Sequence, residues 1–320
     1  MPKLILRVIA LLLSTGAFTA SAQQFPTRAV RYIIPALAGG GFDFVARTIS
    51  PRIAEGLGQQ LIVDNRGGAQ GNLGTALGAK AAPDGYTVVL TYIGTLAIAP
   101  WMYPDLGYDP LRDFAHITQL TSSPYLVVVH PSVSARTLKE LAALAKAHPN
   151  QLTFASAGTA NQLAGELFKI MTGTKITHIP YKGSSGVLVD LLGGHIALGF
   201  TSPEAMTEHV KKGRLRALAV NGAARLPGLP NVPTSKEAGF PGLDVKGWYG
   251  VSAPANTPRD IVTRLNTEFT KALRLPEVRD RLSNAGYDPV MGTPEEYTAF
   301  VASEYARWGE VVKKSGVTAN

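Results

Sequence analysis

IIPALAGGGFDFVAR, residues Ile33 to Arg47, joins a β-branched run to an amphipathic helical pattern through a proline and three consecutive glycines. A glycine-rich turn between a strand and a helix lets the backbone approach a ligand closely. The N–H groups at the start of such a helix are unpaired, and the helix dipole favours negative charge there. Asp43, in the first turn, complements that dipole and can accept hydrogen bonds from loop N–H groups. The stretch therefore predicts a turn that can hold an anion, with Asp43 bracing the loop.

A second stretch repeats this order of features. LTFASAGTANQLAGELF, Leu152 to Phe168, runs from a strand through small residues and glycine into a helix. Both loops follow strands, and open α/β sheets bind ligands at the carboxyl ends of their strands. Either loop alone could be an ordinary tight turn. Two of them, one from each lobe, could face each other across a cleft and bind a carboxylate. We expect Gly40 to be the glycine that requires either a positive φ or a close approach to the anion.

Strand-like and helical stretches alternate along most of the chain. This alternation, with β-branched strands, predicts an α/β fold of parallel sheets covered by helices on both faces. The expected strands are Val30–Ile34, Gln60–Val63, Thr87–Thr91, Leu126–Val129, Leu152–Ser156, Ile196–Phe200 and Leu215–Val220. The expected helices are Val45–Leu57, Leu138–Ala147, Leu163–Met171, Val187–Leu192 and Ala205–Lys211, with two longer amphipathic helices near residues 261–273 and 297–312.

The chain of 320 residues is too long for one small core, so two lobes are expected. Pro124 and the stretch Ala253 to Pro258 (APANTP) are the best candidates for crossing points. We therefore expect lobe 1 to comprise residues 23–123 and 249–320, and lobe 2 to comprise residues 124–248. Two strands crossing between the lobes would form a hinge across a ligand cleft.

The composition and the N-terminal stretch limit the classes of protein to which the chain can belong. Lys3 and Arg7, an apolar stretch and Ala20-Ser21-Ala22 form a signal peptide over residues 1–22, which predicts export to the periplasm and cleavage near Ala22. The chain has no cysteine, which excludes disulfides, thiol catalysis and a lipid-modified cysteine. A formal charge of +8 on a chain of this length is smaller than the excess of basic residues typical of nucleic-acid-binding proteins, so no nucleic-acid partner is expected.

The motifs of catalysis and cofactor binding are missing or broken. Gly39-x-Gly41 begins a dinucleotide fingerprint, but Phe44 occupies the third glycine position. No phosphate-binding GxxxxGK[ST] sequence and no nucleophile-elbow GxSxG sequence occurs. The six histidines lack metal-ligand spacing. We therefore expect no catalytic residues, no metal and no cofactor; an exported Rossmann-like oxidoreductase is the disfavoured alternative.

The chain resembles the solute receptors of tripartite tricarboxylate transporters, called Bug receptors, over essentially its whole mature length. The resemblance implies an α/β, two-lobed periplasmic binding protein of the type II kind. Such a receptor, expected here as a monomer, closes on a small organic acid and delivers it to membrane permease subunits. A sensor kinase as partner would fit the same fold and pocket. The motifs that carry the resemblance are TRAVRYIIPALAGGGFDFVAR, VDNRGGAQGNLGTALGAKAAPDGYTVVL, YDPLRDF, LTFASAGTANQLAGELF, HIPYKGSSGVLVDLLGGHIAL, GRLRALAV, VPTSKEAGFPGL and APANTP.

The resemblance also implies a set of ligand-binding residues. The family's carboxylate-binding loops match residues 36–43 and 156–161, and two further cleft-lining segments match residues 91–100 and 200–206. Lys182 is a candidate charge partner, and a surface role fits it equally well. The implied ligand-binding residues are Ala38, Gly39, Gly40, Gly41, Phe42, Asp43, Thr91, Tyr92, Gly94, Thr95, Ser156, Ala157, Gly158, Thr159, Asn161, Tyr181, Thr201 and Ser202.

The first loop departs from the family pattern. Ala36 stands where the family usually has Phe, and Gly41-Phe42 replaces a small polar pair. Losing a hydroxyl and gaining Phe42 makes the pocket rim more aromatic, and Tyr92 could add a second ring. These residues favour an aromatic carboxylate as ligand, although Phe42 could instead pack against the neighbouring helix.

Overall fold

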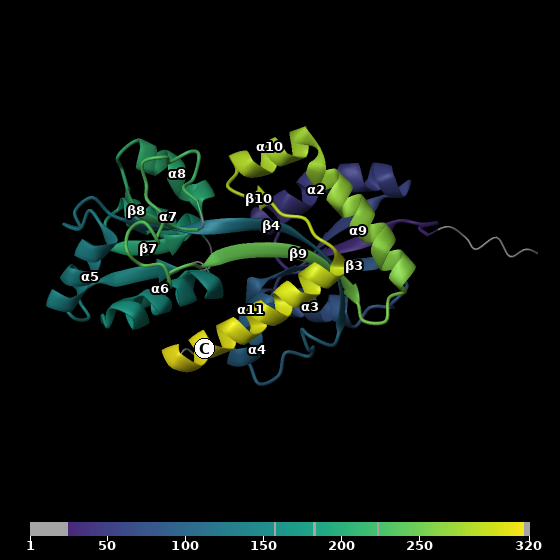
Figure 1. Cartoon of the computed structure of the whole chain (residues 1–320), viewed down its shortest axis with the longest axis horizontal. Helices are drawn as coiled ribbons and strands as arrows, with labels where there is room; N and C mark the ends of the chain where they lie inside the picture. The colour runs from purple at the N-terminus through teal and green to yellow at the C-terminus, as the bar shows by residue number, and fades with distance from the viewer. Residues whose placement is uncertain (1–24, 157, 182–183, 223, 317–320) are drawn as a thin grey trace, which may run out of the picture.

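A computed structural model describes residues 25–156, 158–181, 184–222 and 224–316. The expected signal peptide, Ala157 and Lys182 lie outside these residues. The described chain folds into two α/β lobes joined by long strands (Figure 1). None of the helices in this part of the chain has the length and hydropathy of a membrane span.

The described strands pair into one continuous sheet. Its order is β2-β1-β3-β9-β4-β7-β5-β6, and both β8 and β10 also pair with β4. The strands are β1 (Val30–Ile34), β2 (Leu61–Asn65), β3 (Thr87–Tyr92), β4 (Phe114–Val129), β5 (Thr153–Ser156), β6 (Thr177–Pro180), β7 (Leu198–Thr201), β8 (Arg216–Asn221), β9 (Lys246–Pro254) and β10 (Asp288–Pro289).

The helices cover the sheet and begin and end at recognisable residues. Helix α2 ends at Gly58, which adopts the left-handed conformation (φ 67°) that glycine tolerates best. Thr293 and Glu296 form a capping box at the start of α11. The helices are α2 (Gly41–Leu57), α3 (Asn72–Ala79), α4 (Ala99–Met102), α5 (Leu138–Ala147), α6 (Thr159–Thr172), α7 (Ser184–Leu192), α8 (Pro203–Lys211), α9 (Arg259–Arg274), α10 (Pro276–Asn284) and α11 (Pro294–Ser315), with a 3₁₀ turn η1 (Ala69–Gly71) and a π turn η2 (Gly94–Ile98).

The prediction of parallel sheets is correct only for three strands in each lobe. Strands β1, β2 and β3 pair in parallel, as do β5, β6 and β7. The two long strands β4 and β9 are antiparallel to each other and to the strands beside them. The chain enters the second lobe along β4 and returns along β9, and adjacent strands that leave and return must run in opposite directions.

Strands β4 and β9 cross between the lobes (Figure 1). Residues Phe114 to Pro124 of β4 pair with β9, and from Tyr125 onward β4 pairs with β7 and β8. The lobe boundaries expected at residues 123/124 and 248/249 fall on these two strands. A hinge made of two hydrogen-bonded strands would bend as a unit and keep the lobes in register.

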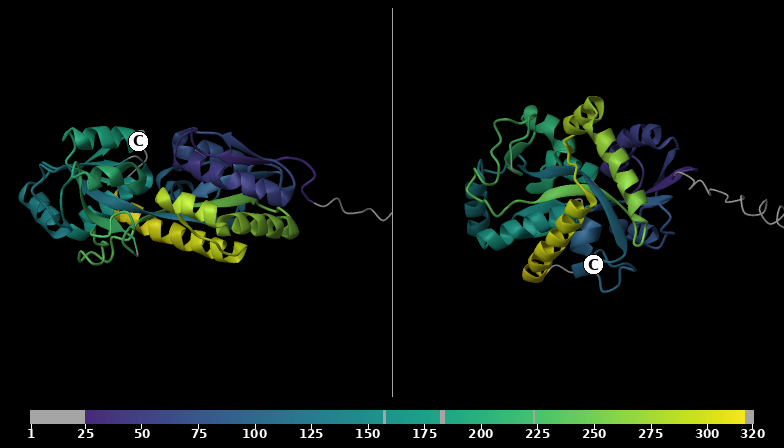
Figure 2. Two further views of the ribbon diagram at one scale, coloured as in Figure 1. Left: turned by 90° about the horizontal axis from the view of Figure 1, so that it is seen from above. Right: turned by 45° about the vertical axis from the view of Figure 1, so that its right-hand side comes forward.

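Each lobe has its own apolar packing. In the first lobe, Ile49 of α2 and Phe269 of α9 are fully buried against β1 and β3. In the second, the buried rings of Phe154 and Phe168 both contact Phe200, with centroids 5.7 and 6.0 Å apart. Helix α11 lies along the crossing strands and contacts elements of both lobes, including α6 and α9 (Figure 2). It therefore braces the back of the hinge.

Candidate ligand-binding site

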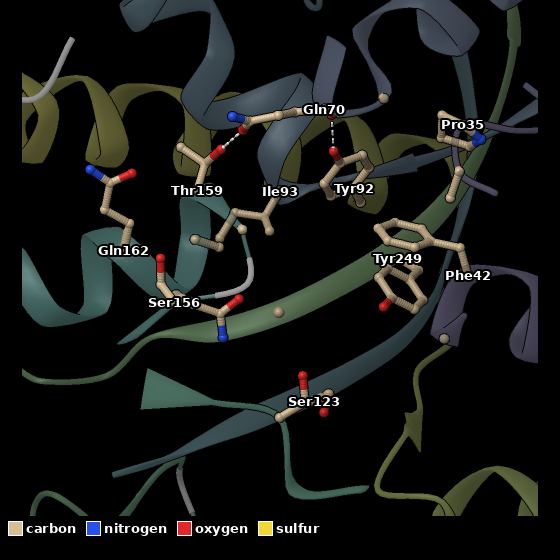
Figure 3. A pocket seen from close by; sticks show the side chains of 18 of the residues that line it. Pro35, Phe42, Gln70, Tyr92, Ile93, Ser123, Ser156, Thr159, Gln162 and Tyr249 are labelled. Carbon is tan, nitrogen blue, oxygen red and sulfur yellow. Dashed lines mark hydrogen bonds between the residues drawn. The ribbon is translucent and has the colours of Figure 1, made fainter. Parts of the chain in front are cut away.

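A cavity of about 910 Å³ lies between the two lobes and is lined by residues from both. Aromatic side chains of Phe42, Tyr92 and Tyr249 occupy one side, and polar side chains of Ser156, Thr159 and Gln162 lie opposite (Figure 3). The volume suits a small organic molecule. The expected site residues that line the cavity are Gly41, Phe42, Tyr92, Ser156, Gly158, Thr159, Asn161, Tyr181 and Ser202.

The other expected site residues that the structure describes do not line this cavity. Thr91 is buried inside the sheet, where its hydroxyl group lies 3.2 Å from Ser252 Oγ and 3.0 Å from Tyr297 Oη. Thr95 is also buried, and its hydroxyl group donates to the Tyr92 carbonyl at 3.3 Å. Ala157 lies outside the described residues. The remaining members of this group are Ala38, Gly39, Gly40, Asp43, Gly94 and Thr201.

The first loop uses its three glycines differently from our expectation. Gly40 has φ −92° and ψ −178°, which any residue can adopt, and an added Cβ there would meet open space. The predicted positive φ at Gly40 is therefore wrong, and no atom of the described residues crowds this position. Gly39 carries the positive φ (87°). Gly41 is the crowded position, because a Cβ on it would overlap the hydroxyl group of Tyr287.

Asp43 braces this loop, as expected. Its carboxylate accepts hydrogen bonds from the backbone N–H of Gly39 at 3.0 Å and from Nε of Arg47 at 2.9 Å. Burial by itself raises the pKa of Asp43, but the hydrogen bonds from Arg47 and Gly39 outweigh it and hold the pKa below its ordinary value of 3.8. The carboxylate thus points into the loop and helix, away from the cavity lining.

Replacing Asp43 with alanine should lower the free energy of unfolding at neutral pH by about 0.5–2 kcal/mol, as for other side chains that accept a backbone N–H hydrogen bond at the start of a helix. The folded-state pKa lies below the unfolded value, so the contribution is fully present above pH 3.8 and is lost as the pH falls through the folded pKa. Urea unfolding of both proteins at pH 7 and near pH 3 measures this. A difference that is equally large at both pH values would contradict the bracing role.

The start of α6 forms the polar side of the cavity. Its N-cap residue Gly158 is extended and offers no side-chain cap, so the first N–H groups of the helix are free of intrahelical partners. Beside them, Ser156 Oγ lies 2.7 Å from His178 Nε2. Burial, with a smaller contribution from Lys169, lowers the pKa of His178 to about 4, so its ring is neutral at pH 7. Asn161, 9 % exposed, keeps its amide Nδ2 buried with no hydrogen-bond partner among the described residues.

The start of α2 faces the same cavity from the other lobe. Its N-cap, Gly40, also lacks a side-chain cap, and Gly41 and Phe42 line the cavity. The Phe42 ring stacks on Tyr249 (centroids 4.6 Å apart) and meets Tyr92 edge-on (4.7 Å). Phe42 therefore lines the cavity, as expected, and the two rings that it packs against belong to strands β3 and β9 and not to the neighbouring helix of the alternative.

Gln70 connects the two lobes at the mouth of the cavity, and sequence reasoning missed it. Its side-chain Oε1 accepts a hydrogen bond from the hydroxyl group of Thr159, and its carbonyl accepts one from Tyr92 (Figure 3). Ala69 and Gln70 both have positive φ values, 46° and 51°. The signal in the sequence is the glycine-rich stretch GGAQGNLG, residues 67–74, which follows the second strand.

The crossing strands supply further lining residues that the sequence did not reveal. Thr121, Ser123 and Tyr125 come from β4, and Gly247, Trp248 and Tyr249 come from β9. Two others, Glu204 and Tyr287, face each other from opposite lobes, with Tyr287 Oη 3.5 Å from Glu204 Oε1. Among the described residues, no lysine or arginine lines the cavity. The same part of the chain contains no cluster of side chains that could hold a metal ion.

Two lobes, a two-strand connection and a cavity between facing helix N-termini define a periplasmic-type solute-binding protein, and solved periplasmic binding proteins share this fold. Residues 45–317 match the model of the tripartite tricarboxylate transporter family receptors, and the chain belongs to that family.

Similar proteins agree with this assignment. The protein BugT of Bordetella pertussis is 36 % identical over 317 residues, which cover 98 % of this chain and 97 % of BugT. The structure of R. palustris Rpa4515 with adipate has a TM-score of 0.83 and 36 % identity, covering 92 % of this chain and 99 % of that one. The structure of MatC from Rhodopseudomonas palustris with bound malate has a TM-score of 0.80 and 32 % identity, covering 90 % and 100 %.

Proposed function

We propose that this protein is a periplasmic receptor that captures a small organic acid with an aromatic body and delivers it to a tripartite tricarboxylate-type membrane transporter. One observation carries the proposal: the uncapped N-termini of α2 and α6 face one cavity from opposite lobes. A carboxylate placed between them would satisfy free N–H groups from both lobes at once. Binding would then stabilise the closed arrangement of the lobes.

Backbone N–H groups would donate most of the hydrogen bonds that hold the carboxylate. A helix N-terminus stabilises a negative charge by about 0.3–1 kcal/mol when exposed and by up to about 2 kcal/mol when partly buried. One helix end is therefore too weak to offset the desolvation of the acid. Two helix ends, with Ser156 and the unpartnered amide of Asn161, supply several donors in one enclosed place. The bound adipate and malate of the two R. palustris structures support the carboxylate as ligand class.

Three further parts of the proposal rest on the family and the sequence. The family name supports delivery to a transporter. A sensor kinase is the second candidate partner, and ligand uptake by a deletion strain separates the two: uptake is lost only if the receptor serves a permease. Export follows from the expected signal peptide at residues 1–22. We propose no enzymatic activity for this receptor.

A thermal-shift screen tests the binding function. The purified mature protein is heated with aliphatic and aromatic mono- and dicarboxylates, and with uncharged amides of the same acids as controls. A ligand at 100 times its dissociation constant stabilises a protein by roughly 2.7 kcal/mol, which moves the midpoint measurably. Stabilisation by acids and not by their amides is the expected result. No shift with any carboxylate would contradict the proposed function.

The aromatic part of the proposal predicts a selective effect of Phe42→Ser. The Phe42 ring offers an aromatic acid a flat apolar partner, and such contacts are worth about 0.5–1.5 kcal/mol beyond buried area. Calorimetry should show aromatic acids weakened by roughly two- to tenfold and aliphatic acids unchanged. Phe44→Ser is the matched control, because Phe44 lies on the same helix but outside the cavity lining. Equal losses for both ligand classes would show that Phe42 only supports the fold.

A further inference from the structure

Glu204 is a carboxylate inside a cavity that is proposed to bind a carboxylate. It lies in the first turn of α8, after Ser202 and Pro203, and its side chain lines the cavity. The residue as a whole is exposed to solvent, yet the surrounding protein still desolvates its carboxyl group. This desolvation raises the pKa of Glu204 above its ordinary value of 4.5. An ionised Glu204 would repel a second negative charge on a ligand bound beside it.

The groups that face Glu204 do not balance its charge. Tyr287 Oη is 3.5 Å away, and hydrogen bonds from the backbone N–H of Glu204 itself, from Ser202 and from Tyr287 stabilise the ionised form only in part. Burial raises the pKa of Tyr125 and of Tyr249, and the negative charge of the nearby Glu204 raises both further. In the described part of the chain, Glu204 forms no ion pair with a lysine, arginine or histidine. The carboxylate is thus surrounded by neutral hydroxyl groups and aromatic rings.

Glu204 lies at the aromatic end of the cavity. Tyr287 contacts Tyr249 (centroids 5.6 Å apart), and Tyr249 stacks on Phe42. Ser156, Thr159 and the start of α6 lie opposite these rings (Figure 3). A ligand whose carboxylate binds at the start of α6 would therefore extend its other end towards the rings and Glu204. A positively charged group is attracted both by a carboxylate and by aromatic ring faces.

We infer that the physiological ligand is a zwitterion, whose carboxylate is held at the N-terminus of α6 and whose cationic nitrogen pairs with Glu204. The inference rests on the proposed function and narrows its ligand class. A dicarboxylate of the same length would place its second negative charge against Glu204. A ligand with an ammonium group there would replace that repulsion with an ion pair in a partly desolvated place. Glu204 would then determine specificity without any change at the carboxylate-binding loops.

Calorimetry at pH 7 with two matched ligand pairs tests the inference. One pair is 6-aminohexanoate and adipate, and the other is 4-(aminomethyl)benzoate and terephthalate. The members of each pair differ only in the group at one end. The wild-type protein should bind the amino member roughly tenfold more tightly or better, since an attraction replaces a repulsion at close range. Glu204→Gln should reduce that ratio by a similar factor.

Glu208→Gln is the matched control variant. Glu208 lies one turn further along α8, outside the cavity lining, and forms an exposed ion pair with Lys211 at 2.9 Å. It should leave the ratio of the two affinities unchanged. Circular dichroism and unfolding midpoints establish that both variants are folded. The ratio of affinities measured with the wild-type protein tests the inference even if a variant fails to fold.

The outcomes separate the inference from the proposed function. Equal or tighter binding of the dicarboxylates to the wild-type protein would overturn the zwitterion inference and leave carboxylate binding intact. If Glu204→Gln still binds the amino member of each pair more tightly than the dicarboxylate, the role of Glu204 is overturned. A dicarboxylate preference that Glu204→Gln removes would show a protonated Glu204 donating to the ligand, which also overturns the inference. Failure of every acid to bind would overturn the proposed function itself.

Discussion

Replacing Gly41 with alanine is expected to weaken ligand binding by about tenfold or more and to destabilise the fold by about 1–3 kcal/mol, the usual cost of over-packing. A Cβ at Gly41 would overlap the Tyr287 hydroxyl group and lie 3.3 Å from that of Tyr249. Tyr287 is only 3 % exposed, so its ring has little room to withdraw. The first turn of α2 must therefore move, which misdirects the N–H groups that face the cavity. Calorimetry and thermal unfolding measure the two effects.

Gly40→Ala is the matched control for this prediction. Gly40 is the preceding residue, its φ of −92° suits alanine, and an added Cβ there would meet no atom within 4 Å. We expect its ligand affinity to stay within about twofold of the wild-type value, since no contact and no helical position is lost. If both variants lost affinity equally, the loop would be sensitive to any added side chain, and the crowding at Tyr287 would not be the cause.

Glu304→Leu should produce the largest loss of stability. The Glu304 carboxylate is 8 % exposed and accepts hydrogen bonds from the indole N–H groups of Trp248 (2.9 Å) and Trp308 (3.1 Å). Leucine fills a similar space but leaves both buried N–H groups unpaired, and each such group costs about 1–3 kcal/mol. We expect a loss of about 2–5 kcal/mol and a midpoint lower by roughly 10 °C. Ligand affinity should fall as well, because Trp248 lines the cavity.

Two comparison variants serve as controls for Glu304→Leu. Glu304→Gln keeps an oxygen acceptor in the same place and should retain most of the stability. Glu310→Leu, on the same helix, replaces an exposed side chain whose ion pair with Lys314 is long (3.9 Å), and it should change the unfolding free energy by less than about 0.5 kcal/mol. Loss of stability in Glu304→Gln as large as in Glu304→Leu would show that the charge of Glu304, which forms an ion pair with Arg307 at 3.3 Å, matters more than hydrogen-bond acceptance from the two indole N–H groups.

Local patterns in the sequence were enough to predict several elements and both loops. Strand β1 (Val30–Ile34) and helix α5 (Leu138–Ala147) have the predicted bounds. The two glycine loops lie against one cavity, and Asp43 braces the first of them. These features depend on neighbours within a few residues: the periodicity of apolar side chains, the cap at Thr137 and the acid in a first helical turn. Such information is contained in a short window of sequence.

Only the tertiary structure showed which residues meet across the cleft. Residues Phe114–Pro124 and strand β9 carry polar residues and glycines that weaken a strand pattern; Gly250, for example, is required because a Cβ there would overlap Tyr297, 47 positions later. Gln70 and Thr159 are separated by 89 residues, and Tyr287 and Glu204 by 83. A turn pattern cannot indicate such pairs, because their proximity depends on how β4 and β9 place the two lobes. The charge at Glu204 and the crowding at Gly41 are therefore consequences of the fold, and no local sequence rule contains them.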